Sequence, residues 1–115
     1  MNNCIFCKII KGEIPSKKVY EDKDVIVFHD IAPKAPVHLL VVSNKHVESL
    51  REVSKNDSEL LGKLLLTIKE VAIKAGISQR GYKVVINNGS DSGQLVDHLH
   101  FHVLGGWSTK AGWEV

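Results

Sequence analysis

Three histidines alternate with apolar residues late in the chain, where residues 98–104 read HLHFHVL. Alternate side chains of a β-strand point to the same face, so His98, His100 and His102 share one face and the apolar side chains share the other. The apolar face has to be buried against a core, and this fixes the register of the strand. The segment therefore requires a sheet with one buried face and one histidine-lined face.

The other apolar segments predict short strands and two helices. Runs rich in β-branched and aromatic residues predict strands at 18–21, 25–28, 37–42 and 82–86. Apolar residues recur every three or four positions over 57–75, which predicts one long helix. Its buried stripe is predicted to consist of Leu60, Leu61, Leu64, Leu65, Ile68, Val71, Ala72 and Ala75. Asn56 and Glu59 should cap the start of this helix, and residues 4–11 should form one or two helical turns.

Strands, one long helix and further strands are typical of an α+β fold with a mostly antiparallel sheet. A chain of 115 residues suffices for a single domain, expected over 1–115. Segment 37–42 is apolar on both faces apart from His38. It is therefore expected in the middle of a sheet that is covered on both sides.

Composition argues against several classes of function. The net charge is +2 and no basic run exceeds two residues, so nucleic-acid binding is not indicated. The apolar runs are too short to span a membrane, and the first residues lack the basic and apolar segments of a secretory signal. We therefore expect a cytoplasmic protein, in which Cys4 and Cys7 are thiols or metal ligands rather than a disulfide.

The histidine-lined face can bind either a metal or an anion. Positions i and i+4 of a strand lie about 13 Å apart, so His98 and His102 are not expected to share one ion. The loop 87–94 contains two glycines and precedes the strand, and its backbone N–H groups could cradle phosphate oxygens. An unprotonated imidazole beside a bound phosphate is a good nucleophile toward phosphorus.

Residues 98–104 resemble the histidine-triad motif, His-φ-His-φ-His-φ-φ, of the HIT superfamily. Further segments match its histidine triad nucleotide-binding branch in order and spacing; these are 28–33, 35–42, 87–91, 93–94 and 105–107. The resemblance extends from about Cys4 to Trp107. It implies the HIT fold, in which a five-stranded, mostly antiparallel sheet carries one long helix and a short N-terminal helix. It also implies a homodimer whose two protomers form one continuous sheet.

The resemblance further implies hydrolysis of purine nucleoside phosphoramidates, such as adenosine 5′-monophosphoramidate, to AMP or GMP and an amine, with no cofactor required for catalysis. His100 matches the nucleophile, which would form a nucleotidyl-histidine intermediate. His102 would bind the phosphate, and His38 and His98 would complete the catalytic set. Asp30 would hold the ribose, and apolar residues would surround the base. The predicted nucleotide contacts are Phe6, Ile9, Ile14, Phe28, His29, Asp30, Ile31, Asn87, Gly93, Gln94, Leu95 and Val96.

The sequence departs from the family pattern in two places. Leu95 stands where many members carry serine or another polar residue beside the phosphate. Since a leucine cannot donate a hydrogen bond to the departing amine, we expect weaker turnover or a changed leaving-group preference. The tail 108–115 lacks the usual Trp-Pro-Pro-Gly-like ending, which in the family shapes specificity.

Cys4-x-x-Cys7 is a short chelating pair of the kind that forms half of a zinc site. By resemblance to some bacterial members, His46 and His98 would complete this site. Two thiolates and two imidazoles form a closed site, which is structural rather than catalytic. The alternatives are two buried thiols beside a surface His46, or a redox dithiol, for which the usual thioredoxin-like strand and helix are missing.

Three other functions stay open on the sequence. They are hydrolysis of dinucleoside polyphosphates, a nucleotide-binding regulator with little turnover, and a metal-dependent hydrolase. The short chain and the flanking segments favour the phosphoramidate hydrolase over the first of these.

Overall fold

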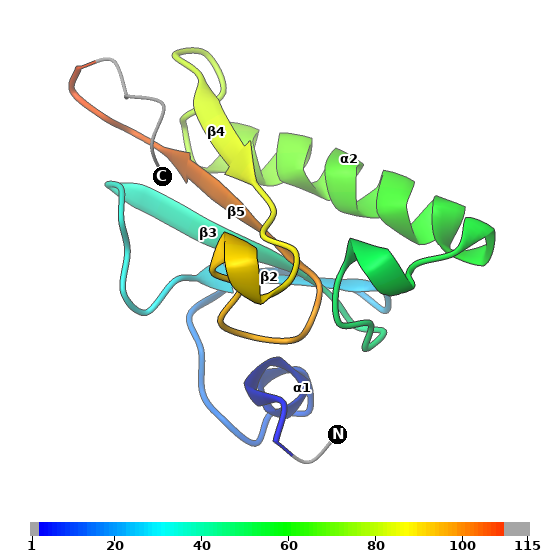
Figure 1. The fold of residues 1–115 in the computed structure, drawn as a ribbon. Helices are drawn as coiled ribbons and strands as arrows, with labels where there is room; N and C mark the ends of the chain where they lie inside the picture. The colour runs from blue at the N-terminus through cyan, green and yellow to red at the C-terminus, as the bar shows by residue number, and fades with distance from the viewer. Residues whose placement is uncertain (1–2, 110–115) are drawn as a thin grey trace.

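The computed structural model describes residues 3–109, which form one sheet with a helix on each of its two faces (Figure 1). In chain order the elements are α1 (Ile5–Ile10), β1 (Lys18–Glu21), β2 (Val25–His29), β3 (Val37–Ser43), η1 (Leu50–Glu52), η2 (Lys55–Asp57), α2 (Ser58–Lys74), β4 (Tyr82–Val85), η3 (Ser90–Ser92) and β5 (His100–Gly105). The predicted domain ends, residues 1–2 and 110–115, lie outside the described residues.

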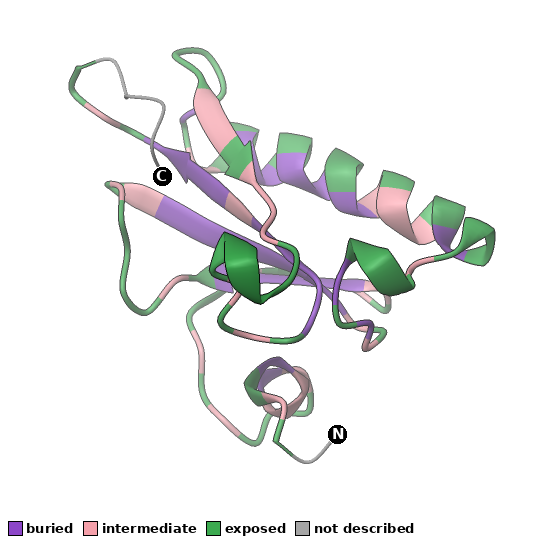
Figure 2. Ribbon diagram, in the orientation of Figure 1, coloured by how far each residue is buried: buried purple, intermediate pink, exposed green. Residues whose placement is uncertain are grey.

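The five strands lie in the order β1-β2-β3-β5-β4, and every neighbouring pair is antiparallel. This confirms the predicted α+β fold with one long helix. β3 occupies the centre, as its apolar sequence predicted, and nearly all of it is buried (Figure 2).

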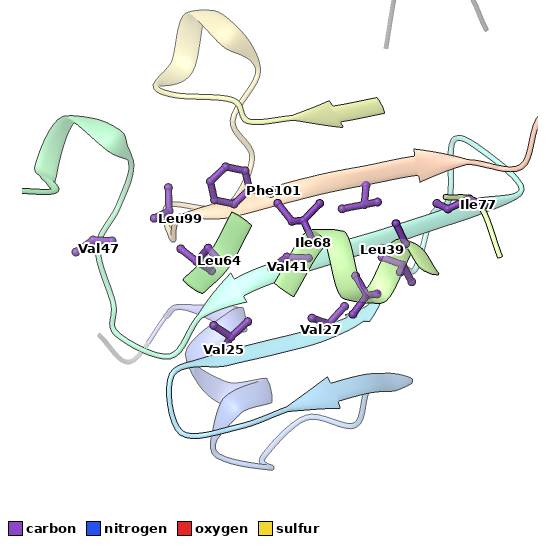
Figure 3. Close-up of a cluster of buried hydrophobic side chains, with 13 residues drawn as sticks. Val25, Val27, Leu39, Val41, Val47, Leu64, Ile68, Ile77, Leu99 and Phe101 are labelled. Atoms are coloured by element: carbon purple, nitrogen blue, oxygen red, sulfur yellow. The ribbon is translucent and has the colours of Figure 1, made fainter. Parts of the chain in front are cut away.

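Alternate residues of β2 and β3 belong to two separate cores. The α2 core lies between the sheet and α2 (Figure 3). The α1 core lies on the opposite face, where α1 covers the sheet; its buried members are Phe6, Ile9, Ile26, Phe28, Leu40 and Val42. Both faces of β2 and β3 are covered, which explains why these strands are apolar without alternation.

Two expectations about α2 are wrong. Asn56 and Glu59 do not cap its start. α2 follows directly on η2, which begins with a capping box in which the side chains of Ser54 and Asp57 bond each other's backbone N–H groups, and α2 itself has no side-chain cap hydrogen bond at Asp57. Asp57 also accepts a hydrogen bond from Lys45 at 2.6 Å, a long-range contact that no local pattern reveals. Leu65 does not belong to the buried stripe, since 56% of its side chain is exposed.

Within residues 3–109 no helix is both long and apolar enough to cross a membrane.

Candidate functional site

β5 and β3 bring His38, His100 and His102 together on the α1 face of the sheet. In the β3–β5 pairing, Leu40 is opposite His102 and Val42 is opposite His100. Leu99, Phe101 and Val103 belong to the α2 core, which confirms the predicted alternation. β5 begins at His100, two residues later than predicted, so His98 and Leu99 precede the strand. His38, near the start of β3, lies beside His102, with their ring centroids 5.1 Å apart.

The tautomer of His100 follows from its one hydrogen bond. Nδ1 lies 2.6 Å from the backbone carbonyl oxygen of His98. A carbonyl can only accept, so Nδ1 carries the proton of the neutral ring and Nε2 carries the lone pair. Among the described residues, no group bonds Nε2. The ring is buried against Phe6, with centroids 5.0 Å apart, so its orientation is restricted.

The protons of His38 and His102 are fixed by a chain of hydrogen bonds. The backbone N–H of Lys34 donates to His38 Nδ1 at 3.0 Å, so a neutral His38 carries its proton on Nε2. That nitrogen lies 2.8 Å from His102 Nδ1. His102 therefore accepts at Nδ1 and carries its own proton on Nε2. Asp30 lies 3.5 Å from His38 Nε2 and supports the protonated nitrogen.

All three rings are neutral at physiological pH. Burial is the main cause and lowers the pKa of His102 to about 4, with the neighbouring His100 and His38 acting in the same direction. Burial also lowers the pKa of His100 and of His38, although Asp30 opposes the shift in both. The site therefore presents a nitrogen lone pair on His100 and an N–H donor on His102, the two groups that attack on phosphorus requires.

The loop 87–94 before β5 is stabilised by hydrogen bonds among its own residues. Gly89 and Gly93 adopt φ angles of 84° and 87°, which glycine reaches without the steric cost that other residues have. The side chain of Gln94 accepts from Gly89 N and donates to the carbonyl oxygen of Glu48, both at 2.7 Å. The N–H groups of Gly89, Ser92, Gly93 and Gln94 all bond within the loop. These four groups therefore already have partners within the loop, and the phosphate cradle stays a prediction.

The predicted nucleotide contacts fall into two sets. Phe6, Ile9 and Phe28 are buried members of the α1 core, and Ile14 and Val96 pack against it. The exposed or partly exposed set is His29, Asp30, Ile31, Asn87, Gly93, Gln94 and Leu95. Two apolar side chains in this set, Ile31 and Leu95, are 99% and 92% exposed. The first set can form only the floor of a base site, whereas the second can touch a ligand directly.

A second cluster lies where α1 meets the start of β5. His98 Nδ1 is 3.2 Å from Cys4 Sγ, 3.6 Å from Cys7 Sγ and 3.1 Å from His46 Nδ1. Cys7 Sγ is 3.3 Å from His46 Nδ1. Both cysteines are free thiols. The four residues that the family resemblance implied as metal ligands therefore converge on one point.

The donor set of this cluster fits a tetrahedral zinc ion. Metal–ligand bonds of about 2.0–2.3 Å place tetrahedral ligands roughly 3.3–3.8 Å apart, close to the distances above. His98 Nε2 lies 2.6 Å from the carbonyl oxygen of Ser43, so Nε2 carries the proton of the neutral ring. Nδ1 of His98 therefore carries the lone pair, and it lies 3.1 Å from Nδ1 of His46. Burial lowers the pKa of His98 to about 4, which favours this neutral, ligating form.

These contacts separate His98 from the other histidines of the triad. One ring nitrogen faces the cysteines and the other bonds Ser43, so neither is directed toward His100. The structure thus assigns the His98 ring to the metal-ligand cluster and gives no geometry for its predicted catalytic role.

Asp30, His38 and His102 also have potential ligand atoms within 4.8 Å of one another. His38 Nε2 and His102 Nδ1 face each other across a hydrogen bond, however, so an ion there would have to displace the proton between them. This group is better explained as a hydrogen-bonded relay.

Sequence reasoning missed two backbone groups that the site uses. Ser43 supplies the carbonyl that fixes the His98 tautomer, and Lys34 supplies the N–H that fixes that of His38. No sequence signal identifies either one, since any residue type offers the same backbone atoms.

Comparisons with known proteins agree with this geometry. The family model described as HIT domain matches residues 11–109. Protein HitA of Neisseria gonorrhoeae is 46% identical over 105 residues, which cover 91% of this chain and 97% of that protein. A crystal structure of a HIT family hydrolase from Legionella pneumophila Philadelphia 1 has 45% identity and a TM-score of 0.91, covering 96% and 97% of the two chains. A histidine triad nucleotide-binding protein from Candida albicans has 36% identity and a TM-score of 0.81, covering 96% and 86%.

Proposed function

The chain belongs to the HIT domain family, and from this membership and the geometry of its histidines we propose that it is a hydrolase of purine nucleoside phosphoramidates. The relative from Legionella pneumophila is named a hydrolase and the one from Candida albicans a nucleotide-binding protein. Both names fit a site that offers a nucleophile and a neutral N–H donor.

The observation that carries the proposal is the tautomer of His100. Its Nδ1–H is held by the His98 carbonyl oxygen at 2.6 Å, so the Nε2 lone pair is free to attack the α-phosphorus. The new N–P bond replaces the P–N bond to the leaving group, whose amine departs with the bonding electrons and takes up a proton. Water then cleaves the nucleotidyl-histidine and releases the nucleoside monophosphate. His102 donates its Nε2–H to a phosphate oxygen while negative charge grows there.

The nucleotide would lie across the exposed set of predicted contacts. Asp30 is proposed to accept hydrogen bonds from the ribose hydroxyls; one of its oxygens already accepts the N–H of Ala32 at 2.8 Å, which orients the carboxylate. A purine base would cover the exposed Ile31 and rest on the α1 core. Asn87, Gly93 and Gln94 stay predicted phosphate contacts.

Substrate comparison tests the proposal directly. We expect kcat/KM for adenosine 5′-monophosphoramidate to exceed that for diadenosine polyphosphates by at least about 100-fold, which corresponds to roughly 3 kcal/mol of transition-state discrimination. Equal turnover of both substrates would favour the dinucleotide alternative. Tight AMP binding with no turnover of either would favour a nucleotide-binding regulator. Hydrolysis that persists in His100→Gly but is abolished by chelator in the folded protein would favour metal-dependent chemistry.

Leu95 is expected to limit protonation of the leaving amine. Replacing it with serine places a hydroxyl donor beside the phosphate, and we expect kcat for a poorly activated alkyl phosphoramidate to rise about tenfold. Leu95→Ala is the matched control, since it removes the same bulk without adding a donor. If Leu95→Ser and Leu95→Ala have the same kcat as the unmodified protein, Leu95 has no part in amine departure.

We also propose that the chain forms a homodimer through α2 and β4. Leu65 and Leu66 are 56% and 64% exposed on α2, beside the exposed Ile73. β4 is an edge strand, and Val84 on it is exposed. Exposed apolar side chains next to an open strand edge favour pairing with a second copy.

Sedimentation tests the dimer. We expect twice the 12.7 kDa chain mass for the unmodified protein and the single-chain mass for Leu66→Glu combined with Ile73→Glu. The control is Lys23→Glu, an exposed change in the turn between β1 and β2. A monomeric unmodified protein at micromolar concentration would contradict the proposal.

Finally, we propose that Cys4, Cys7, His46 and His98 hold a structural zinc ion. The convergence of four ligand atoms within 4.8 Å supports it, and so does the lone pair of His98 Nδ1. A reducing compartment such as the cytoplasm would keep both thiols available as ligands.

A further inference from the structure

We propose that the Cys/His cluster positions His100, so that a loaded metal site keeps the nucleophilic nitrogen in its reactive form. The cluster and the proposed active site share one residue: the ring of His98 lies in the cluster and its carbonyl oxygen bonds His100 Nδ1. The inference depends on the proposed function only in giving His100 the role of nucleophile.

The first connection passes through the backbone of His98. Its ring is held at both nitrogens, at Nε2 by the Ser43 carbonyl and at Nδ1 by the cluster. A ring anchored on both sides leaves its own backbone little freedom, so the carbonyl stays 2.6 Å from His100 Nδ1. If this hydrogen bond loosens, neutral His100 can move its proton to Nε2, and the lone pair then no longer faces the substrate.

The second connection passes through α1. Cys4 caps this helix and Cys7 lies in its first turn, so the cluster holds α1 against the sheet. Phe6 lies between the two cysteines in sequence, and its ring packs edge-on against His98 and His100 with centroids 5.9 and 5.0 Å apart. A helix of six residues has little stability of its own. The cluster therefore also fixes the side chain that restricts rotation of the His100 ring.

The cluster is reachable from solvent without unfolding. Cys4 and His46 line a surface pocket of about 400 Å³, together with Glu48, Leu95 and Asp97. A pocket of this volume admits a small chelator or a hydrated ion. We therefore expect that metal can be removed and restored in the folded protein, which would make the proposed coupling measurable.

The test compares zinc-loaded and zinc-depleted full-length protein labelled with ¹⁵N-histidine, at a temperature at which circular dichroism shows the same helix content. Long-range ¹H–¹⁵N spectra report the tautomer of His100 in the absence of substrate. We expect a single Nδ1–H form when zinc is bound and a mixture after depletion. kcat should fall about 10- to 100-fold on depletion, the usual cost of losing an outer-shell partner, while the Kd for AMP changes less than about threefold.

Two single variants keep the proposal testable if depletion unfolds the chain. His98→Asn and His46→Asn each remove one proposed ligand and leave three. Only His98→Asn also removes the ring that anchors the backbone carbonyl bonded to His100. We expect the tautomer mixture and the lower kcat in both variants as their zinc content falls, at equal folded fraction. The change should be larger in His98→Asn, which also loses the contact with the Ser43 carbonyl.

A single Nδ1–H tautomer with unchanged kcat in His98→Asn, or in folded zinc-depleted protein, would overturn the coupling. The tautomer is measured without substrate, so it is independent of the reaction assignment. Hydrolysis that persists without His100 would instead contradict the proposed function and leave the coupling intact.

Discussion

Replacing His100 with glycine is expected to lower kcat/KM for an adenosine phosphoramidate by at least about 10³-fold, because the attacking nitrogen is lost. Nucleotide binding should survive, with the Kd for AMP changed less than about tenfold, since the proposed ribose and base contacts lie on other residues. Steady-state kinetics and calorimetric titration with AMP measure the two quantities. His100→Asn should behave in the same way while keeping a polar side chain of intermediate size.

The control for this pair is Lys23→Gln, an exposed substitution in the turn between β1 and β2. It should leave both constants unchanged. A His100→Gly protein that is folded and still hydrolyses the substrate within tenfold of the unmodified rate would rule out His100 as the nucleophile. Trapping a nucleotidyl group on the unmodified chain by rapid acid quench, and failing to trap it on the variant, would identify the attacking residue.

Loss of the metal site is expected to have the largest effect on stability. The unmodified protein should contain about one zinc ion per chain. Cys4→Ser combined with Cys7→Ser should contain almost none. A ligand that is present at 1,000 times its Kd stabilises the folded state by about 4 kcal/mol. For a domain of this size the double variant should therefore unfold about 15 °C lower. Atomic emission and thermal unfolding by circular dichroism measure the two results.

A matched pair of histidine variants separates metal loss from simple loss of an imidazole. His46→Asn removes a proposed ligand, whereas His29→Asn removes an exposed imidazole at the end of β2 that lies outside the cluster. Only His46→Asn should lower both zinc content and Tm. A zinc content well below one per chain in unmodified protein that was never exposed to chelator would contradict the site.

Most of the fold could be predicted because its signals are local and repeated. A period of two placed β5, runs of β-branched and aromatic residues placed the other strands, and a period of three to four placed α2, all within about two residues of their observed ends. The errors occurred where tertiary contacts override local preference. Asn56 is a good capping residue, but the capping box forms two residues earlier, between Ser54 and Asp57, where Lys45 also bonds Asp57, and it starts η2 rather than α2. Leu65 continues the apolar stripe but lies on the outer face, where only a second chain could bury it.

The residues of the site could be predicted from the sequence, but the positions of the protons on its histidine rings could not. The alternation in 98–104 determined which side chains share a face, and the family resemblance assigned His100 and His102 their roles. The phosphate cradle stays a prediction, and the structure adds that the Gln94 side chain and backbone carbonyls already bond four N–H groups of the loop. Composition indicates only that a loop can take left-handed angles, not where its hydrogen bonds end.

The sequence by itself determined that both faces of the sheet are buried at its centre, since segment 37–42 is apolar on both faces. It also determined that three histidines line up beside one another, which follows from the strand period. Only the tertiary structure decided which nitrogen of each ring carries a proton, and that the His98 ring, which the resemblance gave both a catalytic and a metal-ligand role, is directed to the cysteines. Those properties depend on single hydrogen bonds between distant residues, such as His38 to His102 across 64 positions and His98 to Ser43 across 55. No periodicity encodes such contacts, because they exist only once the strands have paired in register.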